Sequence, residues 1–324
     1  MTRCARRLSL LPLAVTLGLI VPFLSEAQNS DAARAAEGTR INPETAPRPS
    51  VRATRTPRPI TVDGKLDEAE WALAEPMTDF VQQLPRTGYP ARFRTEARLL
   101  YDADHIWIGA INYDPEPRKA ITVGLERDFN SGNSDLFGLV LDTFLDRRNS
   151  FLFLVNPHGA VRDEQTYNDS RNVVDAWEGI INVKTSINDS SWVVELEIPT
   201  RTLRFNAGRG GGTQDWGVNL IRRVRRVNET SYWSPLERQY RVHRMSKAGT
   251  LTGLEGLHQG RNLLIKPFAL GGTSSGLQVP TSSLGSRYDA GGDLKYGVSP
   301  SLTLDLTYNT DFSQVEVDQQ QVNL

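Results

Sequence analysis

The chain has 324 residues and carries 37 lysine and arginine residues against 38 aspartate and glutamate residues, so its formal net charge is -1. Such a balance offers no cationic surface for the phosphates of a nucleic acid, and it argues against that class of partner. The one cysteine, Cys4, lies near the start of the chain. The rest of the chain can therefore form no disulfide and no thiolate site.

Residues 1–27 are predicted to be a secretory signal peptide. Three arginines precede the apolar run Leu8–Leu24, and Ser25–Ala27 has the small-x-small pattern of a cleavage site. The alternative is an uncleaved membrane anchor, but proline and glycine residues interrupt the run, which is short for a membrane span. Cleavage would leave 34 basic and 37 acidic residues, a net charge of -3. The sequence thus predicts export to the periplasm, the outer membrane or the cell surface.

Residues 28–57 are rich in alanine, arginine, proline, asparagine and threonine and show no apolar periodicity, which predicts a disordered leader. Folding is expected to begin at Ile60–Trp71. There a short strand reaches an Asp-Gly turn, and Asp67 is expected to cap a brief helix. Trp71 is expected to close one end of the core.

Residues 58–256 are predicted to form an antiparallel β-sandwich. Its centre is the hairpin of Asp135–Phe144 and Ser150–Asn156, because both runs are apolar on both faces and a short charged loop joins them. Further strands are expected at 95–101, 105–113, 177–185, 192–198 and 216–221. Short strands at this spacing, with little helix, indicate an all-β sandwich of the jelly-roll or immunoglobulin type.

Five segments, in the expected order, resemble the family 9 carbohydrate-binding module. They are Ile60–Trp71, Leu100–Ile108, Asn156–Gly159, Trp192–Pro199 and Trp216–Asn219. The resemblance implies a non-catalytic, sugar-binding β-sandwich that is usually attached to another domain. Modules of this family occur on xylan-degrading enzymes. A glycoside hydrolase, or an accessory module in carbohydrate catabolism, is therefore the alternative that the resemblance leaves open.

Residues 262–324 have a different character. Amphipathic strands are expected at 262–270, 288–296 and 302–308, with apolar and polar residues alternating in the last. This pattern is typical of outer-membrane strands, although soluble sheet hairpins would share it. The stretches 292–297 and 311–324 resemble the start of an uncharacterised barrel domain that commonly follows this module in exported bacterial proteins. We therefore expect the first strands of a truncated outer-membrane β-barrel, in a fragment too short to close it.

Sugar binding requires an aromatic face and polar side chains beside it. In the family that the chain resembles, two facing tryptophans clamp a terminal sugar with help from arginine, glutamate and an amide. Trp177 is the candidate for the first aromatic because it follows a polar loop and precedes a strand, although a place in the core would suit it equally. Trp107, Tyr89 and Tyr113 are candidates for the second.

Glu96 and Arg98 lie two residues apart on one predicted strand, so they face the same side and could hydrogen-bond a sugar diol. The alternative is a surface ion pair, which would contribute little. In the family that the chain resembles, the aromatic pair is what binds the ends of glucan or xylan chains, so this binding is expected only if the pair is present. A third hypothesis is then a sandwich that plugs or gates the barrel and binds no sugar.

No catalytic residue and no cofactor are predicted. The four histidines lack the paired spacing of a zinc site. Gly272–Gly276 matches the G-x-S-x-G pattern, but no helix is expected to follow it, as a nucleophile elbow would need. A glycosidase would need two carboxylates across a cleft, which a sequence cannot show.

For two further groups of charged residues, a role in binding is one of two interpretations. Asp163, Asp169 and Asp175 lie in oxygen-rich loops of the kind that suit Ca²⁺, although the spacing of an EF-hand is absent. The run Arg222–Arg226 could hold an anionic glycan. Its alternative is the solvated side of a strand followed by a turn.

Overall fold

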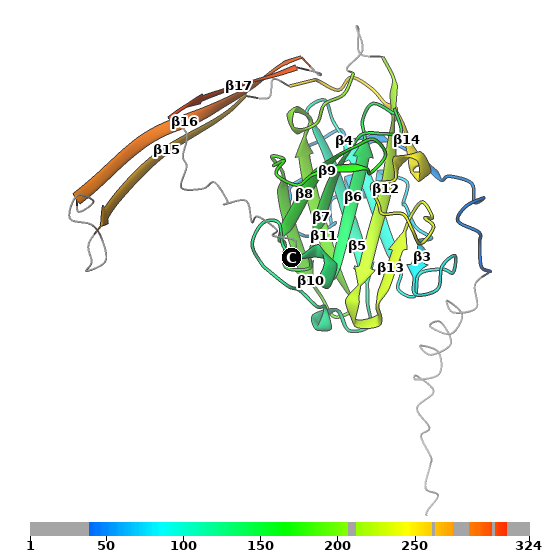
Figure 1. Ribbon diagram of the computed structural model, residues 1–324. Helices are drawn as coiled ribbons and strands as arrows, with labels where there is room; N and C mark the ends of the chain where they lie inside the picture. Colours follow the sequence, from blue (N-terminus) through cyan, green and yellow to red (C-terminus); the bar gives the residue numbers. More distant parts are fainter. Residues whose placement is uncertain (1–38, 207–211, 261–262, 275–284, 300–301, 310–324) are drawn as a thin grey trace, which may run out of the picture.

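A computed structural model describes residues 39–206, 212–260, 263–274, 285–299 and 302–309 (Figure 1). The predicted signal peptide, the first part of the predicted leader and the stretch 311–324 lie outside the described residues. The described part consists of strands and short 3-10 helices without an α-helix, so the predicted all-β class is confirmed. None of its helices has the length and apolar content needed to cross a membrane.

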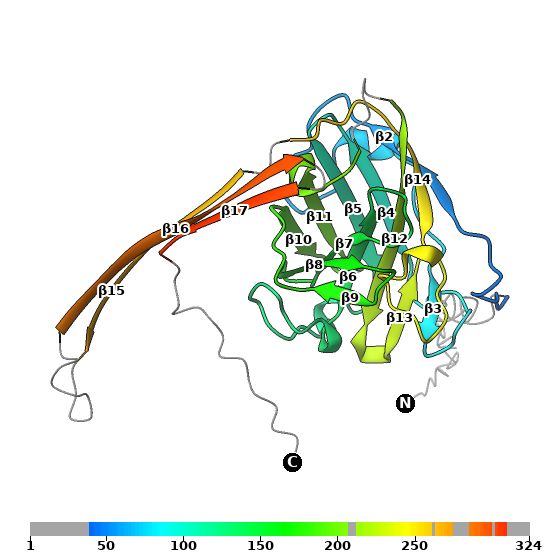
Figure 2. The ribbon, with the colours of Figure 1, turned by 45° about the horizontal axis from the view of Figure 1, so that its top comes forward.

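Two stacked sheets form the predicted β-sandwich (Figures 1 and 2). Across the first sheet the strands are β1 (Ser50–Arg52), β14 (Gly249–Leu254), β12 (Gln214–Val224), β6 (Leu136–Asp142), β7 (Ser150–Val155), β8 (Val161–Tyr167) and β9 (Asn172–Val174), and β13 (Glu229–Tyr232) joins β12 to β3 (Val81–Leu84). Across the second they are β10 (Asn182–Ile187), β11 (Ser191–Pro199), β5 (His105–Tyr113), β4 (Thr95–Tyr101) and β2 (Thr54–Arg55).

Short 3-10 helices connect some of these strands. They are η1 (Ala69–Leu73), η2 (Pro117–Lys119), η3 (Ser131–Asn133), η4 (Thr200–Thr202), η5 (Arg225–Val227) and η6 (Met245–Lys247). None of the six has a side-chain hydrogen bond at its N-cap. The cap predicted for Asp67 is therefore wrong: η1 follows Glu68, whose carboxylate accepts from the backbone N–H of Thr61 and the indole N–H of Trp71.

The hairpin of β6 and β7 forms the centre of the first sheet, as the sequence predicted. Phe137 lies opposite Val155 and Leu141 opposite Phe151, and every residue of both strands is buried. One face packs against the second sheet in the main core. Side chains from residues 233–248 cover the other face. Both apolar faces are thereby removed from water, which is the physical reason for the continuous apolar runs.

The outer face of the second sheet is covered by residues 57–74. Trp71 packs there with Leu100 and Trp107, so it does not close an end of the core as predicted. Gly109 makes this close approach possible, because a Cβ at this position would lie 2.4 Å from the side chain of Leu66 and 3.0 Å from the Trp71 ring. Both sheets thus have a covered outer face.

The prediction of a disordered leader at residues 28–57 is wrong for its last part. Strand β1 pairs in parallel with β14, with Val51 opposite Leu251, and β2 pairs in parallel with β4. Val51 and Ala53 are buried in the main core. Strands of three and two residues are too short to show a period in the sequence, so only the pairing with distant strands reveals them.

Strands β15 (Leu263–Ser274), β16 (Gly285–Ser299) and β17 (Leu302–Tyr308) form a separate antiparallel sheet, which extends away from the sandwich (Figures 1 and 2). The three predicted strands are confirmed, and the first two are longer than expected. The register places Ile265, Leu294 and Leu306 side by side on one face. Lys266, Asp293 and Thr307 share the opposite face. The described strands form an open sheet.

Candidate functional site

A pocket of about 270 Å³ opens at the ends of strands β7 and β8, and we call it the aromatic pocket. It is lined by Thr143, Phe144, Asn149, Ser150, Phe151, Gln165, Thr166, Tyr167 and Arg204. The side chains of Phe144 and Tyr167 are 38% and 40% exposed, which is unusual for large aromatic residues. The pocket therefore combines accessible ring surface with amide, hydroxyl and guanidinium groups.

The register of β7 and β8 places the polar and aromatic side chains together. Phe151 lies opposite Gln165, so their side chains share the face of the sheet that is turned toward the second sheet. Tyr167 is two residues further along β8 and therefore lies on the same face. Its hydroxyl donates a 2.7 Å hydrogen bond to Oε1 of Gln165, which leaves the amide NH₂ of Gln165 as the donor for a ligand.

The loop between β6 and β7 forms one wall of the pocket and is held by a buried carboxylate. Asp142 accepts from the backbone N–H groups of Phe144, Asp146 and Arg147, at 3.3, 3.2 and 2.7 Å. Burial raises the pKa of Asp142, and these hydrogen bonds oppose the rise. Leu145 and Arg147 have positive φ angles of 52° and 59°. The loop is thus tightly turned around Asp142, and Phe144 projects from it.

Arg204 lies on the wall that residues 203–205 contribute. Its neighbours Leu203 and Phe205 are fully buried in the main core. The side chain of Gln259 accepts from the N–H of Phe205 and donates to the carbonyl of Leu203. The hydroxyl of Thr143 donates to the carbonyl of Arg204 itself. The backbone that carries Arg204 is therefore fixed on both sides.

Trp177, the predicted sugar-binding aromatic, lies beside the pocket and is partly buried. Its ring contacts Phe151 and Phe153, with centroid distances of 5.2 and 5.8 Å, and it packs against the main core. Residues 177–181 are coil and β10 begins at Asn182, later than the predicted strand. Phe151 thus lines the pocket and also contacts the ring of Trp177, which is not itself one of the lining residues given above.

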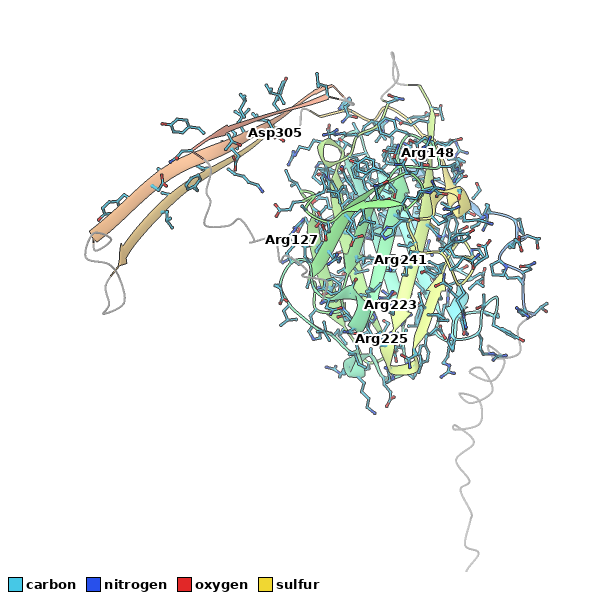
Figure 3. All side chains as sticks on the ribbon, in the orientation of Figure 1. Arg127, Arg148, Arg223, Arg225, Arg241 and Asp305 are labelled. Carbon is cyan, nitrogen blue, oxygen red and sulfur yellow. The ribbon has the colours of Figure 1, made fainter. Side chains whose placement is uncertain are left out.

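A buried carboxylate on β8 fixes the coil that follows Trp177. Asp163 accepts from the backbone N–H of Gly179 and from the guanidinium of Arg127, at 2.7 Å for the latter. Figure 3 shows Arg127 at the side of the sandwich that faces the tail sheet. A Cβ at residue 179 would lie 2.9 Å from the Trp177 ring and 3.2 Å from the Asp163 carboxylate, so a larger residue here would displace these side chains.

The other predicted sugar ligands lie elsewhere. Trp107 is 1% exposed beneath residues 57–74 and has no surface for a ligand. Glu96 and Arg98 form an ion pair at 2.7 Å, and Arg98 also donates to the carbonyls of Trp71 and Ala74. This arrangement matches the alternative interpretation of Glu96 and Arg98, in which they form an ion pair and do not bind a sugar. The structure does not bring these three residues together with Trp177.

Tyr89 and Tyr113, the further candidates for the second aromatic, do not line the pocket either. An arginine side chain lies against each ring, 3.9 Å above Tyr89 and 5.2 Å from Tyr113. Sequence reasoning missed Phe144, Tyr167, Gln165 and Arg204. A detectable signal was present, because Phe144 and Tyr167 each directly adjoin a polar turn at the end of a strand, where a large apolar side chain is least easily buried.

The carboxylates suggested for Ca²⁺ have protein partners or lie apart. Asp163 pairs with Arg127, and Asp169 pairs with Arg244 at 3.0 Å and accepts from Ser246. Asp175 is exposed. The described residues contain no group of three or more histidine, cysteine, aspartate or glutamate side chains arranged for a metal ion.

Arginines of the run Arg222–Arg226 also make their contacts within the protein. Arg222 is buried between the sheets, Arg223 donates to the carbonyl of Ser131, and Arg226 pairs with Asp114 at 2.7 Å. Figure 3 places Arg223 and Arg225 toward the end of the sandwich opposite Arg148. The glycan-binding interpretation of this run therefore finds no support in the geometry.

A second, larger crevice of about 730 Å³ lies between residues 41–51 and 75–81. Prolines and small polar residues make up most of its wall. Among the described residues that line it, the one aromatic residue is Trp233, which is only 7% exposed. This crevice lacks the accessible ring surface that distinguishes the aromatic pocket.

Comparisons with known proteins concern the two parts of the chain separately. Residues 262–324 match a family model described as "Domain of unknown function (DUF5916)". No protein with curated annotation matches the chain. The sandwich is similar to a solved structure from Bacteroides uniformis described as a "putative carbohydrate-binding protein", with 14% identity and a TM-score of 0.50 over 63% of this chain and 98% of that one. This similarity extends to the fold alone.

Two further structures are of a family 9 carbohydrate-binding module from Caldicellulosiruptor kristjanssonii. The complex with cellotriose is 14% identical and that with glucose 13% identical, and each has a TM-score of 0.46. Each comparison covers 63% of this chain, and they cover 93% and 95% of the module, respectively.

Proposed function

We propose that the sandwich is a carbohydrate-binding module that binds sugar in the aromatic pocket without catalysis. The observation that carries the proposal is the accessible pair of rings, Phe144 and Tyr167, beside the amides of Asn149 and Gln165. The C–H face of a pyranose packs on an aromatic ring, and its hydroxyls require such polar partners. Trp177 would stabilise the pocket through Phe151 and extend the aromatic surface.

The size of the pocket favours a small ligand. Its 270 Å³ lies just below the range of about 300–1,000 Å³ that is usual for ligand pockets. A single sugar residue, at a chain end or a branch, suits this volume better than the middle of a polysaccharide. None of the described lining residues is a carboxylic acid, so the pocket lacks the carboxylate pair that a typical glycoside hydrolase requires.

A glycan array with the full chain, followed by calorimetric titration of the best ligand, tests the proposal. Tyr167→Ala is expected to weaken binding about tenfold or more, because it removes ring surface and a hydrogen bond to Gln165. Tyr113→Ala is the matched control, since Tyr113 lies on the second sheet away from the pocket. A folded protein that binds no glycan, or equal affinities for the two variants, would contradict the proposal.

We further propose that the tail sheet contacts lipid as part of an outer-membrane domain. Its face with Ile265, Leu302 and Leu306 leaves these side chains 60%, 57% and 56% exposed. Strands β15 and β16 have 12 and 15 residues, enough to cross a bilayer as tilted strands, which takes about 9–11 residues. Together with the expected signal peptide, this supports an exported protein whose sugar-binding part is attached to the outer membrane.

Substitutions on the two faces of β17 distinguish membrane contact from a soluble sheet. Leu306→Lys is expected to reduce the fraction of the full chain that floats with liposomes, because a charge on a lipid-facing strand costs about 2–4 kcal/mol near the bilayer centre. Thr307→Lys, on the opposite face, is the control. If the unsubstituted chain does not float, or if both variants behave alike, the lipid contact is refuted.

A further inference from the structure

We propose that the aromatic pocket selects an N-acetylated sugar, a 2-acetamido-2-deoxyhexose, and that the side-chain amides of Asn149 and Gln165 bind its acetamido group. This inference rests on the proposed function and adds the chemical class of the ligand. An acetamido group carries one carbonyl acceptor, one N–H donor and one methyl group. The lining of the pocket offers a partner for each of the three.

The side chain of Gln165 supplies the donor. It is partly exposed on β8, and its Oε1 accepts the 2.7 Å hydrogen bond from the hydroxyl of Tyr167. This hydrogen bond distinguishes the two ends of the amide. With Oε1 engaged, the NH₂ group is the end that can serve a ligand, and it is suited to donate to the carbonyl oxygen of an acetamido group.

The side chain of Asn149 supplies the acceptor. Its NH₂ group donates to the carboxylate of Asp146 at 2.5 Å, and a carboxylate can only accept, so the contact fixes which end of the amide is the oxygen. No hydrogen bond to Oδ1 of Asn149 is formed by the residues that the structure describes. This oxygen is suited to accept from the N–H of an acetamido group.

The two amides lie at the same end of the β7–β8 pair. Ser150 lies opposite Thr166, Asn149 directly precedes Ser150, and Gln165 directly precedes Thr166. All four residues line the pocket. The C=O and N–H of a secondary amide point in opposite directions, so an acetamido group between Asn149 and Gln165 could contact both. A hydroxyl at the same place is smaller and carries no carbonyl for the second contact.

The aromatic lining provides a place for the methyl group. Phe151 is only 6% exposed, whereas Phe144 and Tyr167 are 38% and 40% exposed. Phe151 thus presents too little surface for the face of a pyranose but enough for a methyl group, whose burial is favourable. A hydroxyl held against this ring would lose hydrogen bonds to water. The more exposed rings of Phe144 and Tyr167 remain for the sugar itself.

The charges of the wall favour a neutral substituent. None of the described lining residues is acidic, so the ammonium group of a free amino sugar would have no carboxylate partner among them. The nearby Asp142 accepts three backbone N–H groups of its own loop. Arg204, a cationic lining residue, already interacts within the protein, and no group of the ligand is assigned to it. An acetamido group adds no charge to this wall.

Ligands that differ at the 2-position alone test this inference. Calorimetric titration of the full chain would compare methyl glucoside with its 2-acetamido, 2-amino, 2-formamido and 2-O-acetyl derivatives, and would repeat the series with galactose. In at least one series the acetamido sugar should bind about tenfold more tightly than the parent sugar, through a hydrogen bond and a buried methyl group. The amino sugar should show no such gain.

The two remaining derivatives examine the separate contacts. The formamido sugar lacks the methyl group and should bind more weakly than the acetamido sugar, because less apolar surface is buried. The O-acetyl sugar keeps the carbonyl and the methyl group but lacks the N–H that Asn149 would accept. If this ester binds as tightly as the amide, the pocket recognises an acetyl group without its N–H, and the inference is overturned.

A variant assigns the preference to Gln165. In Gln165→Glu the carboxylate can still accept from Tyr167 but cannot donate to the ligand, so the preference for the acetamido sugar over the parent sugar should fall to about twofold or less. Asn172→Asp is the matched control, because it makes the same change at an exposed position of β9 that does not line the pocket. A preference that survives in Gln165→Glu, or that both variants lose equally, would overturn the inference.

Two further outcomes separate this inference from the proposed function. Equal binding of the parent and acetamido sugars, both weakened by Tyr167→Ala, would overturn the selectivity and retain the sugar site. If a folded chain binds no member of either series, both proposals fail. N-methylacetamide is expected to compete only weakly. Competition as strong as that of the sugar would show an amide site without sugar recognition, and would also overturn the inference.

Discussion

Replacing Arg222 by alanine is expected to lower the free energy of unfolding by about 3 kcal/mol or more. Arg222 is 2% exposed on β12, where it points between the two sheets. Its guanidinium donates to the carbonyls of Arg94 and Tyr113, at 2.9 and 2.8 Å, and to the hydroxyl of Thr95 at 3.1 Å. Alanine would remove the donors of three hydrogen bonds between the sheets and would also leave a cavity, although the carbonyl of Arg94 would still accept from the N–H of Tyr113.

The charge of Arg222 is retained despite its burial. Desolvation lowers the pKa of Arg222 to about 10, and the carboxylates of Asp114 and Glu229 oppose this shift. The guanidinium therefore remains protonated at neutral pH. Its hydrogen bonds link the ends of β4 and β5 in the second sheet to β12 in the first, so one side chain connects the two layers.

Urea unfolding of three variants measures the contribution of Arg222. Arg222→Lys should lie between the unsubstituted protein and Arg222→Ala, because lysine keeps the charge but cannot donate from two nitrogens to separate acceptors. Arg118→Ala is the control, since Arg118 forms an exposed ion pair with Asp189, a type of contact worth about 0–1 kcal/mol. A loss at Arg222 as small as that at Arg118 would refute the bridging role.

The second large effect is a fall in the free energy of unfolding as the pH rises from about 5 to about 8. Glu195 is 1% exposed on β11, and its Oε2 accepts from the backbone N–H groups of Asp63 and Gly64, at 2.9 and 2.7 Å. Its Oε1 has no partner among the described residues. Burial raises the pKa of Glu195 to about 7, and the negative charges of Glu68 and Asp63 raise it further, whereas the two N–H groups lower it.

The direction of the pH dependence follows from where the proton binds more tightly. The folded state holds the Glu195 proton up to about pH 7, whereas the unfolded chain releases it near pH 4.5. The stabilisation is therefore complete below about pH 4.5 and is lost as the pH rises through 7. Burial likewise raises the pKa of Glu229 to about 7, so this residue adds to the same trend. His243 acts in the opposite sense, because burial lowers its pKa.

Denaturation curves between pH 5 and 8 test the role of Glu195. Glu195→Gln should reduce the fall in the free energy of unfolding between pH 5 and 8 by at most about 3 kcal/mol. The reason is that an amide can accept from the same N–H groups but does not titrate. Glu197→Gln, two residues along the same strand and half-buried, is the control. A slope that Glu195→Gln leaves unchanged would show that this carboxyl group does not titrate with folding.

The sequence was most informative where apolar runs extend on both faces of a strand. The runs at 136–142 and 150–155 predicted the centre of the first sheet, because such strands need cover on both sides. The run His105–Tyr113 is also apolar on both faces, a pattern that favours a covered position for Trp107. Its choice as a sugar-binding aromatic went against that pattern, and residues 57–74 do bury it.

The candidate site was less predictable because its members come from separate parts of the chain. Phe144, Gln165 and Arg204 meet only through the register of β7 with β8 and the turn after β11. No spacing in the sequence encodes that meeting. Trp177 could be chosen from its local context, but its contact with Phe151 depends on the coil that Asp163 fixes. Periodicity thus predicts faces of strands, whereas pockets between loops depend on tertiary contacts.

The parallel pairing of β1 with β14 determines how the sandwich would respond to tension. The chain enters the sandwich through β1 and leaves it through β14, and the two strands run side by side in the same direction. Force applied between the segment before Ser50 and the tail sheet would therefore act along both strands. Their hydrogen bonds, which lie across that direction, would be loaded together in shear. The hydrogen bonds between β1 and β14 would then have to break together, so the sandwich should resist such a pull more strongly than strands that separate one hydrogen bond at a time.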